Sequence, residues 1–288
     1  MNYWRTLKEL RLRKFWSDSW GLPIQEYDLI LSDFEPITSR ACWIEGVTCI
    51  TIGHQAAFLS PDVPRPSRRS AFGEWILKSF APADEHIGFH FQPYGEKVFS
   101  PVIRPEIKHC TPTNNGHYLV YLPAIDSQRL IPFLQSFKEF NWKVYAANAK
   151  GIQQYGNVTV YPTDAEAFAA DFASCAGVLM SAGFEGPSEA LYLGKKLAVV
   201  PIKGQYEQAC NAEALRLLSK DIPILTDLFK SRAVLSNWLE SNPAMPKIPV
   251  EEKWKERLME IIDQQCRDSS RESMKMRKEG DVQTETVR

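Results

Sequence analysis

Two short stretches combine glycines with hydrogen-bonding side chains at a spacing suited to an anion that carries hydroxyl groups. The first is SAGFEGPSEA (181–190), which follows the apolar run GVLM. Its glycines allow a ligand to approach the backbone closely, and N–H groups at a helix start attract an anion such as phosphate. Glu189, about one turn further on, is placed to accept hydrogen bonds from paired hydroxyls such as those of a ribose. In the plainer interpretation the glycines only make the turn, and the helix dipole alone favours an early Glu by ~0.3–1 kcal/mol.

The second stretch, KGQYEQACNA (203–212), follows the next apolar run, LAVVPI. It offers Gln205, Glu207, Gln208 and Asn211, which can all hydrogen-bond to hydroxyl groups. Because successive parallel strands end at the same edge of a sheet, we expect the two stretches to lie side by side. A phosphate cradle, a ribose carboxylate and a hydroxyl-binding cluster together describe a nucleotide sugar as the ligand. An ordinary polar helix start is the alternative for the second stretch, but it does not explain why both neighbouring stretches carry side chains that can hydrogen-bond to a ligand.

These stretches belong to a regular alternation of apolar runs and helical stretches that begins at His117. Such alternation is typical of a doubly wound α/β fold with a parallel sheet. Pro187 is expected at the first helical position after GVLMS, with Gly186 as the cap. The expected strands are HYLVYLP, WKVYAAN, NVTVYP, GVLMS, LAVVPI and IPILTD, and the expected helices lie at 126–140, 164–174, 187–193, 207–219 and 226–240.

The N-terminal part predicts a smaller unit of the same kind. Apolar runs at 28–33 and 47–54 flank a helical stretch from Pro36 to Gly46, which makes one βαβ unit with parallel strands. A helix at 71–80 and the strand HIGFHF follow, and SPVIRPEIKHCTPTNNG has the composition of a linker. Further helices are expected over residues 1–16 and 250–265.

The bulk composition argues against a nucleic-acid-binding or membrane-spanning protein. The formal net charge is −1, and no apolar run approaches the ~18–20 residues that a membrane span requires. Six scattered cysteines without a CxxC pair fit a reducing cytosol, so we expect a cytoplasmic protein. The basic N-terminal helix with Trp4 and Trp16, together with Arg65, Arg68 and Arg69, could contact anionic lipid at the membrane surface, although a solvated surface is the plainer interpretation.

Taken together, SAGFEGPSEALYLGKKLAVVPIKGQYEQACNA resembles the donor-binding signature of the GT-B glycosyltransferases. It is similar to that of the UDP-sugar glycosyltransferases and of the N-acetylglucosaminyl transferase of peptidoglycan precursor synthesis. The resemblance implies that Glu189 binds the ribose, that the backbone from Gly183 binds the diphosphate, and that Glu207 with Gln208 holds the donor sugar. Ser181 stands where many members have a phosphate-contacting histidine. The predicted donor-binding residues are Ser181, Gly183, Phe184, Glu185, Gly186, Ser188, Glu189, Gln205, Glu207, Gln208 and Asn211.

The N-terminal stretch DLILSDFEPITSRACWIEGVTCITIGHQAAF is similar to a branch of uncharacterised prokaryotic, chiefly bacterial, glycosyltransferase-like proteins. The resemblance implies two Rossmann-like domains with parallel sheets, a UDP-sugar donor, and inverting transfer that needs no metal and no other cofactor. We expect a partial acceptor-side domain with its linker at 1–108, a nucleotide-sugar-binding domain at 109–265 and a disordered charged tail at 266–288. The glycine-rich GxGH loop of GT-B enzymes is missing. Either the start of the sequence is truncated or misassigned, or the protein is a shortened relative that lacks part of its acceptor half, and an exposed sheet edge is expected.

Glycosyl transfer also needs a general base for the acceptor hydroxyl, which typically contributes ~10²–10⁴-fold to the rate. The candidates Asp33, Glu35 and His54 follow the two N-terminal strands, at the edge expected to face the cleft. Asp33 could instead cap the helix at Pro36, and His54 could be a hydrogen-bonded loop residue. The leading hypothesis is transfer of a sugar from a UDP-sugar to an unknown glycan, lipid or small-molecule acceptor. A GT-B-type sugar-nucleotide epimerase and a non-catalytic nucleotide-sugar-binding protein are the alternatives.

Overall fold

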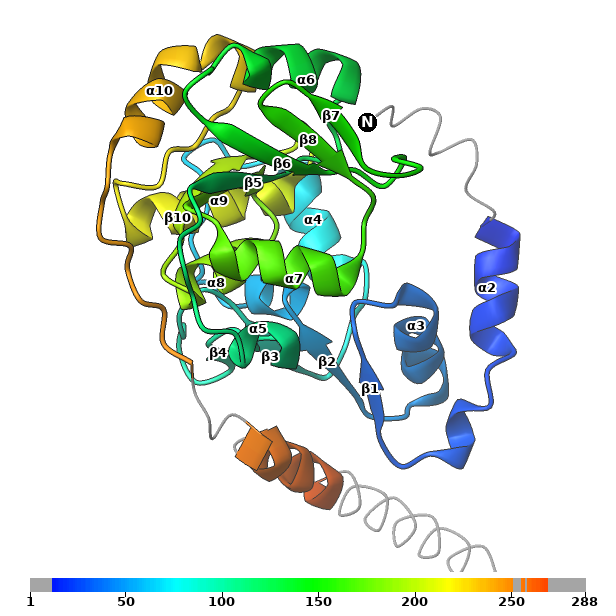
Figure 1. Ribbon diagram of the computed structural model, residues 1–288. Coiled ribbons are helices and arrows are strands. Elements are labelled where there is room, and N and C mark those ends of the chain that lie inside the picture. The colour runs from blue at the N-terminus through cyan, green and yellow to red at the C-terminus, as the bar shows by residue number, and fades with distance from the viewer. Residues whose placement is uncertain (1–11, 251–254, 257, 269–288) are drawn as a thin grey trace, which may run out of the picture.

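The computed structural model describes residues 12–250, 255–256 and 258–268. These residues form two β-sheets, one from each half of the sequence, with helices packed on them (Figure 1). The four-stranded sheet has the order β1-β2-β3-β4, and the six-stranded sheet has the order β10-β9-β5-β6-β8-β7. The alternation of apolar runs therefore predicted the α/β class correctly.

The N-terminal sheet contains the predicted βαβ unit and two further parallel strands. Its strands are β1 (Ile30–Ser32), β2 (Cys49–Gly53), β3 (Glu85–Phe89) and β4 (Val98–Phe99). Between β1 and β2, α3 (Pro36–Glu45) begins at the predicted proline and ends at Gly46, whose φ of 69° is left-handed. β1 and β4 are the two edge strands of this sheet. The other helices of this part are α2 (Leu12–Trp20), η1 (Ile24–Glu26), η2 (Gln55–Leu59) and α4 (Ala71–Ser79).

The C-terminal sheet has its five parallel strands where the apolar runs predicted them. They are β5 (His117–Tyr121), β6 (Asn141–Tyr145), β8 (Val158–Tyr161), β9 (Gly177–Ser181) and β10 (Lys196–Val200). An additional strand, β7 (Gln153–Tyr155), pairs antiparallel with β8, because Gly156 at φ 59° allows a tight turn between them. The predicted strand IPILTD is wrong: only Ile224 forms a bridge, to Val199, since Pro223 has no N–H for a longer ladder.

Helices cover both faces of this sheet. They are α5 (Pro105–Lys108), α6 (Ser127–Gln135), α7 (Ala165–Ser174), α8 (Glu185–Tyr192), α9 (Tyr206–Leu218), η3 (Leu228–Lys230) and α10 (Arg232–Glu240). The start of α8 corrects the prediction, because the helix begins at Glu185 with Phe184 rather than Gly186 as its N-cap. Pro187 therefore lies within the first turn, where a missing N–H costs little since the first four N–H groups have no partner in the helix.

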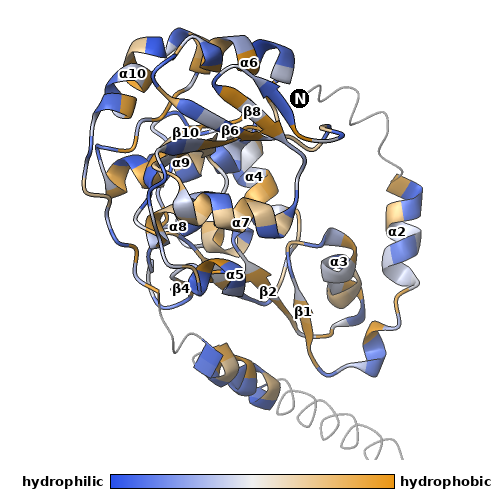
Figure 2. Cartoon of the chain, viewed as in Figure 1, coloured by the Kyte–Doolittle hydropathy of each residue, from blue (hydrophilic) through white to orange (hydrophobic). Residues whose placement is uncertain are grey.

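The strands β5, β9 and β10 of the larger sheet are almost entirely buried, and Figure 2 shows hydrophobic (orange) stretches among the strands of this sheet. Phe172 of α7 and Leu191 of α8 pack on one face, and Leu134 of α6 and Trp238 of α10 pack on the other. All five residues of β10 are buried. A strand buried on both faces appears in the sequence as a continuous apolar run rather than an alternating one, which is why LAVVPI stood out.

The two halves of the chain pack directly against each other. Gly73 of α4 lies so close to Tyr206 of α9 that a Cβ on the glycine would come within 2.4 Å of the ring carbon Cγ. Cys210 of α9 is buried in an N-terminal cluster that includes Phe58 and Leu77. Such tight apolar contact fixes the N-terminal end of α9 relative to the N-terminal sheet.

Near its C-terminus the chain returns to the N-terminal sheet. Helical residues occupy 258–268, and Leu258 and Ile262 pack on a cluster that contains Ile87 and Phe99. Most of the predicted tail, and of the predicted helix at 1–16, lies outside the described residues. Among the described helices, none has both the length and the apolar character to cross a membrane. The domain boundary at 108/109 stays a prediction.

Candidate functional site

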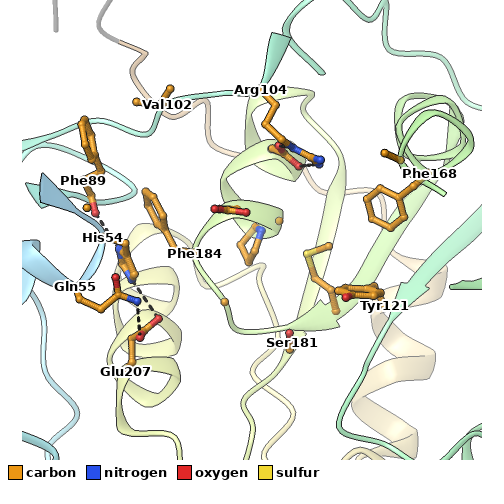
Figure 3. Close-up of a pocket in the computed structure, with 18 of the residues that line it drawn as sticks. His54, Gln55, Phe89, Val102, Arg104, Tyr121, Phe168, Ser181, Phe184 and Glu207 are labelled. Atoms are coloured by element: carbon orange, nitrogen blue, oxygen red, sulfur yellow. Dashed lines mark hydrogen bonds and ion pairs between the residues drawn. The ribbon is translucent and has the colours of Figure 1, made fainter. Parts of the chain in front are cut away.

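The carboxyl ends of strands from both sheets face one cleft with a volume of about 890 Å³. Residues at or after the ends of β1, β2 and β3 line one side, and residues at or after the ends of β5, β8 and β9 line the other. In Figure 3, His54, Gln55 and Glu207 lie at one end of the cleft, and Tyr121 and Phe168 lie at the other. The first turn of α8 contributes lining residues between these two ends.

The start of α8 presents backbone to the cleft, as the first stretch predicted. Gly183, Glu185 and Gly186 all line it, together with Ser181 at the end of β9. A Cβ on Gly183 would meet no protein atom within 4 Å, so the backbone here is open to the cleft. N–H groups of a first helical turn carry no intrahelical partner and attract anions. Ser188 is different: it is buried, and its hydroxyl donates to the carbonyl of Phe184 at 2.8 Å, so it is committed to its own helix.

Glu189 sits one turn into α8 and carries a bidentate ion pair with Arg104. Arg104 Nε donates to Glu189 Oε1 at 2.6 Å, and its terminal nitrogen donates to Oε2 at 2.8 Å. The side chain of Glu189 is 3% exposed, and that of Arg104 is 45% exposed. Hydrogen bonding to Glu189 is the main reason that the pKa of Arg104 is raised, so the guanidinium stays charged. Arg104 comes from the segment between the two sheets and was not among the predicted site residues.

One residue of the second predicted stretch lines the cleft, and the other three do not. Glu207 lines the cleft, where Gln55 Nε2 donates to its Oε2 at 3.1 Å. Gln208 is buried and accepts from the backbone N–H of Ile202 at 3.0 Å, which holds the loop before α9. Asn211 is fully buried and donates to the carbonyl of Ala182 at 3.2 Å, so it ties α9 to the loop before α8. Gln205 is the backbone N-cap of α9 and does not line the cleft.

His54 joins the two halves of the chain. Its Nδ1 lies 2.9 Å from the carbonyl oxygen of Phe89, and its Nε2 lies 3.0 Å from Oδ1 of Asn211. The ring stacks on Phe184 at 4.1 Å between centroids, and its Nε2 is 3.8 Å from Oε1 of Glu207. Burial lowers the pKa of His54, and the nearby Glu207 carboxylate offsets this only in part. An oxygen atom of the protein lies within hydrogen-bond distance of each ring nitrogen. The geometry therefore favours His54 as a hydrogen-bonded loop residue, which is the alternative to the general base that the sequence left open.

Asp33 and Glu35 follow β1 but point to different places. Phe34 between them has a left-handed φ of 49°, which is uncommon for a residue other than glycine. Glu35 caps α3 and accepts from the N–H groups of Ile37 and Thr38 at 3.0 and 2.6 Å. Partial burial would raise the pKa of Glu35, but these hydrogen bonds keep it below its usual value. The capping role that the sequence suggested for Asp33 therefore belongs to Glu35.

Asp33 itself lines the cleft. Its Oδ1 approaches the backbone of Gly53 so closely that a Cβ there would lie 2.2 Å away, and the φ of 147° at Gly53 also favours glycine. No hydrogen bond or ion pair with another described residue holds the Asp33 carboxylate. It is therefore the one of the three candidate bases that combines a place in the cleft with unoccupied oxygen lone pairs.

The far end of the cleft is aromatic, and no local pattern in the sequence pointed to it. Tyr121 at the end of β5 and Phe168 of α7 form an edge-to-face pair with centroids 5.9 Å apart. Met180 and Thr163 line the same part of the cleft, and Asp164 beside them caps α7 by accepting from Ala167 at 2.8 Å. A flat ring with polar edges fits such a site, since aromatic side chains offer their faces and Thr or backbone groups offer hydrogen bonds.

Comparison with known proteins decides the family. The family model described as glycosyl transferase family 1 matches residues 23–241. The chain belongs to this family. The matched residues include both sheets and every residue of the cleft named above.

Solved structures with the same fold are distant in sequence. UGT89C1 of Arabidopsis thaliana complexed with quercetin is 11% identical with a TM-score of 0.53, over 88% of this chain and 77% of that one. Its complex with UDP-L-rhamnose gives 12% and 0.52, over 90% and 78%. MurG of Acinetobacter baumannii gives 16% and 0.49, over 80% and 70%. At these identities the likeness to UGT89C1 shows the fold, which is GT-B as the resemblance implied. No curated protein matches the chain.

Proposed function

We propose that this glycosyltransferase moves a sugar from a UDP-sugar to an acceptor hydroxyl, with inversion and without a metal ion. One observation carries the proposal: a single cleft has open backbone at the start of α8, a buried carboxylate one turn further on and a second carboxylate at the start of α9. The backbone around Gly183 would bind the diphosphate, Glu189 the ribose and Glu207 the sugar. Three groups of different chemistry in one cleft match the three parts of such a donor.

The aromatic end of the cleft supports a nucleotide rather than a sugar phosphate as the donor. Tyr121 and Phe168 stand on the opposite side of α8 from Glu207 (Figure 3). A base placed against these rings would put the ribose towards Glu189 and the diphosphate towards the first turn of α8. The structural neighbour UGT89C1 has been solved in complex with UDP and in complex with UDP-L-rhamnose. UDP is therefore the first nucleotide to test.

In the chemical step, negative charge grows on the leaving diphosphate while the sugar becomes oxocarbenium-like. N–H groups at the start of α8 would stabilise that charge without further reorganisation, as preorganised donors do in other active sites. We assign Asp33 as the general base that accepts the proton of the acceptor hydroxyl. His54 and Asn211 act as positioning residues, because they hold the loops of both halves around the cleft.

The test uses water as a surrogate acceptor, so that the unknown acceptor is not needed. The protein would be incubated with UDP-glucose, UDP-N-acetylglucosamine and UDP-galactose in EDTA, and release of UDP and the anomer of the sugar would be followed by NMR. Slow UDP release with inversion at the anomeric carbon supports the proposal. A changed sugar that is still attached to UDP would instead indicate epimerisation, and binding of UDP without any turnover would indicate a non-catalytic protein.

A further inference from the structure

Arg104 forms an ion pair with Glu189, the residue that we propose binds the ribose. Both carboxylate oxygens of Glu189 accept from the guanidinium, at 2.6 and 2.8 Å. The side chain of Glu189 is 3% exposed, and Arg104 lines the same cleft, so a ribose that binds the carboxylate has to compete with the guanidinium. This pair satisfies a buried charge that would otherwise be costly.

Arg104 is also the main positive charge available to a diphosphate. Five carboxylates line the cleft, from Asp33, Asp164, Glu185, Glu189 and Glu207, whereas Arg104 is the one Lys or Arg among its described lining residues. The carboxylate of Glu185, in the first turn of α8, adds to the attraction of Glu189 that raises the pKa of Arg104, and both residues line the cleft. A diphosphate bound at that turn would add further negative charge beside Glu185.

Arg104 has the freedom to change partners. It is the N-cap residue of α5 (φ −58°, ψ 142°), and its carbonyl accepts from Ile107 and Lys108, so the backbone is held and only the side chain has to move. Almost half of its side-chain surface is exposed, in contrast to the buried Glu189. Guanidinium groups bind carboxylates and phosphates with the same forked geometry, so a phosphate can replace the carboxylate without loss of hydrogen bonds.

We propose that Arg104 is a shared counter-ion that holds Glu189 before the donor binds and moves to the diphosphate when it binds. The exchange frees Glu189 to accept hydrogen bonds from the ribose, and it neutralises the diphosphate in a cleft lined by acidic residues. Arg104 then makes binding of the nucleoside depend on the presence of the diphosphate, and so selects nucleotide sugars over nucleosides. This inference rests on the proposed function.

The two partners of the pair should affect ligands in opposite ways. Arg104→Gln is expected to lower the affinity for UDP and for inorganic pyrophosphate by about tenfold or more, because a charged hydrogen bond of this kind is lost. It should leave uridine binding unchanged or strengthen it, because Glu189 no longer has a competing partner. Glu189→Gln should weaken uridine but strengthen pyrophosphate severalfold, because the guanidinium is released.

Calorimetry with uridine, UDP and pyrophosphate would test this on the full chain. Arg216→Gln is the matched control, since Arg216 makes the same fork to Glu213, at 2.8 and 2.6 Å, outside the cleft. Thermal unfolding would verify that each variant is folded, and Arg104→Lys provides a second variant that keeps the charge.

Opposite changes in pyrophosphate affinity for Arg104→Gln and Glu189→Gln support the exchange. Changes of the same sign in both variants, or equal losses of uridine and UDP in Arg104→Gln, would overturn it and leave donor binding itself intact. If the wild-type protein binds neither UDP nor uridine, the proposed function fails together with the exchange.

Discussion

Replacement of Gly183 by alanine is the most informative single change at the candidate donor site. Gly183 lines the cleft, yet a Cβ there would meet no protein atom within 4 Å, and its φ is not in the left-handed region that favours glycine. The added methyl group therefore stands in the open space of the cleft, where the diphosphate is expected. We predict an unchanged free energy of unfolding, within ~0.5 kcal/mol, as is usual for changes that remove no contact.

The effect on binding should be much larger than the effect on stability. A methyl group between the backbone and a phosphate oxygen prevents one charged hydrogen bond, which is worth ~1.5–3 kcal/mol. The dissociation constant for UDP should therefore rise about 10- to 150-fold. Gly151→Ala is a matched control, because its Cβ also meets nothing within 4 Å but the residue does not line the cleft. Calorimetry with UDP would measure both variants; equal UDP affinity for Gly183→Ala and wild type would refute the assignment of the diphosphate to this loop.

Three further predictions concern particular contacts. Asp33→Asn should lower the turnover rate ~10²–10⁴-fold in a UDP-release assay and keep UDP affinity within about twofold, whereas Glu35→Gln should cost ~1 kcal/mol of stability and little activity. Burial keeps the pKa of His90 well below 6.5, so the unfolded state binds more protons than the folded state at acidic pH. The free energy of unfolding should therefore fall as the pH drops below about 6.5. His90→Phe should reduce this pH dependence by up to ~1.4 kcal/mol per pH unit, measured by urea titrations at several pH values. Gly73→Ala should destabilise the protein through its clash with Tyr206, and a double-mutant cycle with Tyr206→Ala should give a coupling energy above ~0.5 kcal/mol.

The strands and the positions of the loops before α8 and α9 could be predicted from the sequence because both leave local signals. Buried strands such as β10 appear as apolar runs, and a glycine-containing stretch followed by helical spacing marks a turn from a strand into a helix. The same local reasoning placed the start of α8 two residues late, at Pro187 instead of Glu185. Proline is tolerated at any position of a first helical turn. Pro187 therefore indicates where the first turn of α8 lies, but not the residue at which the helix begins.

The remaining site residues could not be predicted because they depend on how distant segments pack. Arg104 reaches Glu189 across 85 positions of sequence, and Gln55 reaches Glu207 across 152. Tyr121 and Phe168 each look like an ordinary core aromatic until both are found beside the cleft. The choice among the candidate bases also required geometry, since only the turn at Phe34 separates the capping Glu35 from the cleft residue Asp33.

A crystal structure of the protein with UDP would test the proposed donor site most directly. We predict the diphosphate within hydrogen-bond distance of the backbone N–H groups between Gly183 and Gly186, and the ribose hydroxyls on the carboxylate of Glu189. The uracil ring should lie beside Tyr121 and Phe168. UDP bound outside this cleft, or bound within it with the diphosphate away from the start of α8, would contradict the proposal.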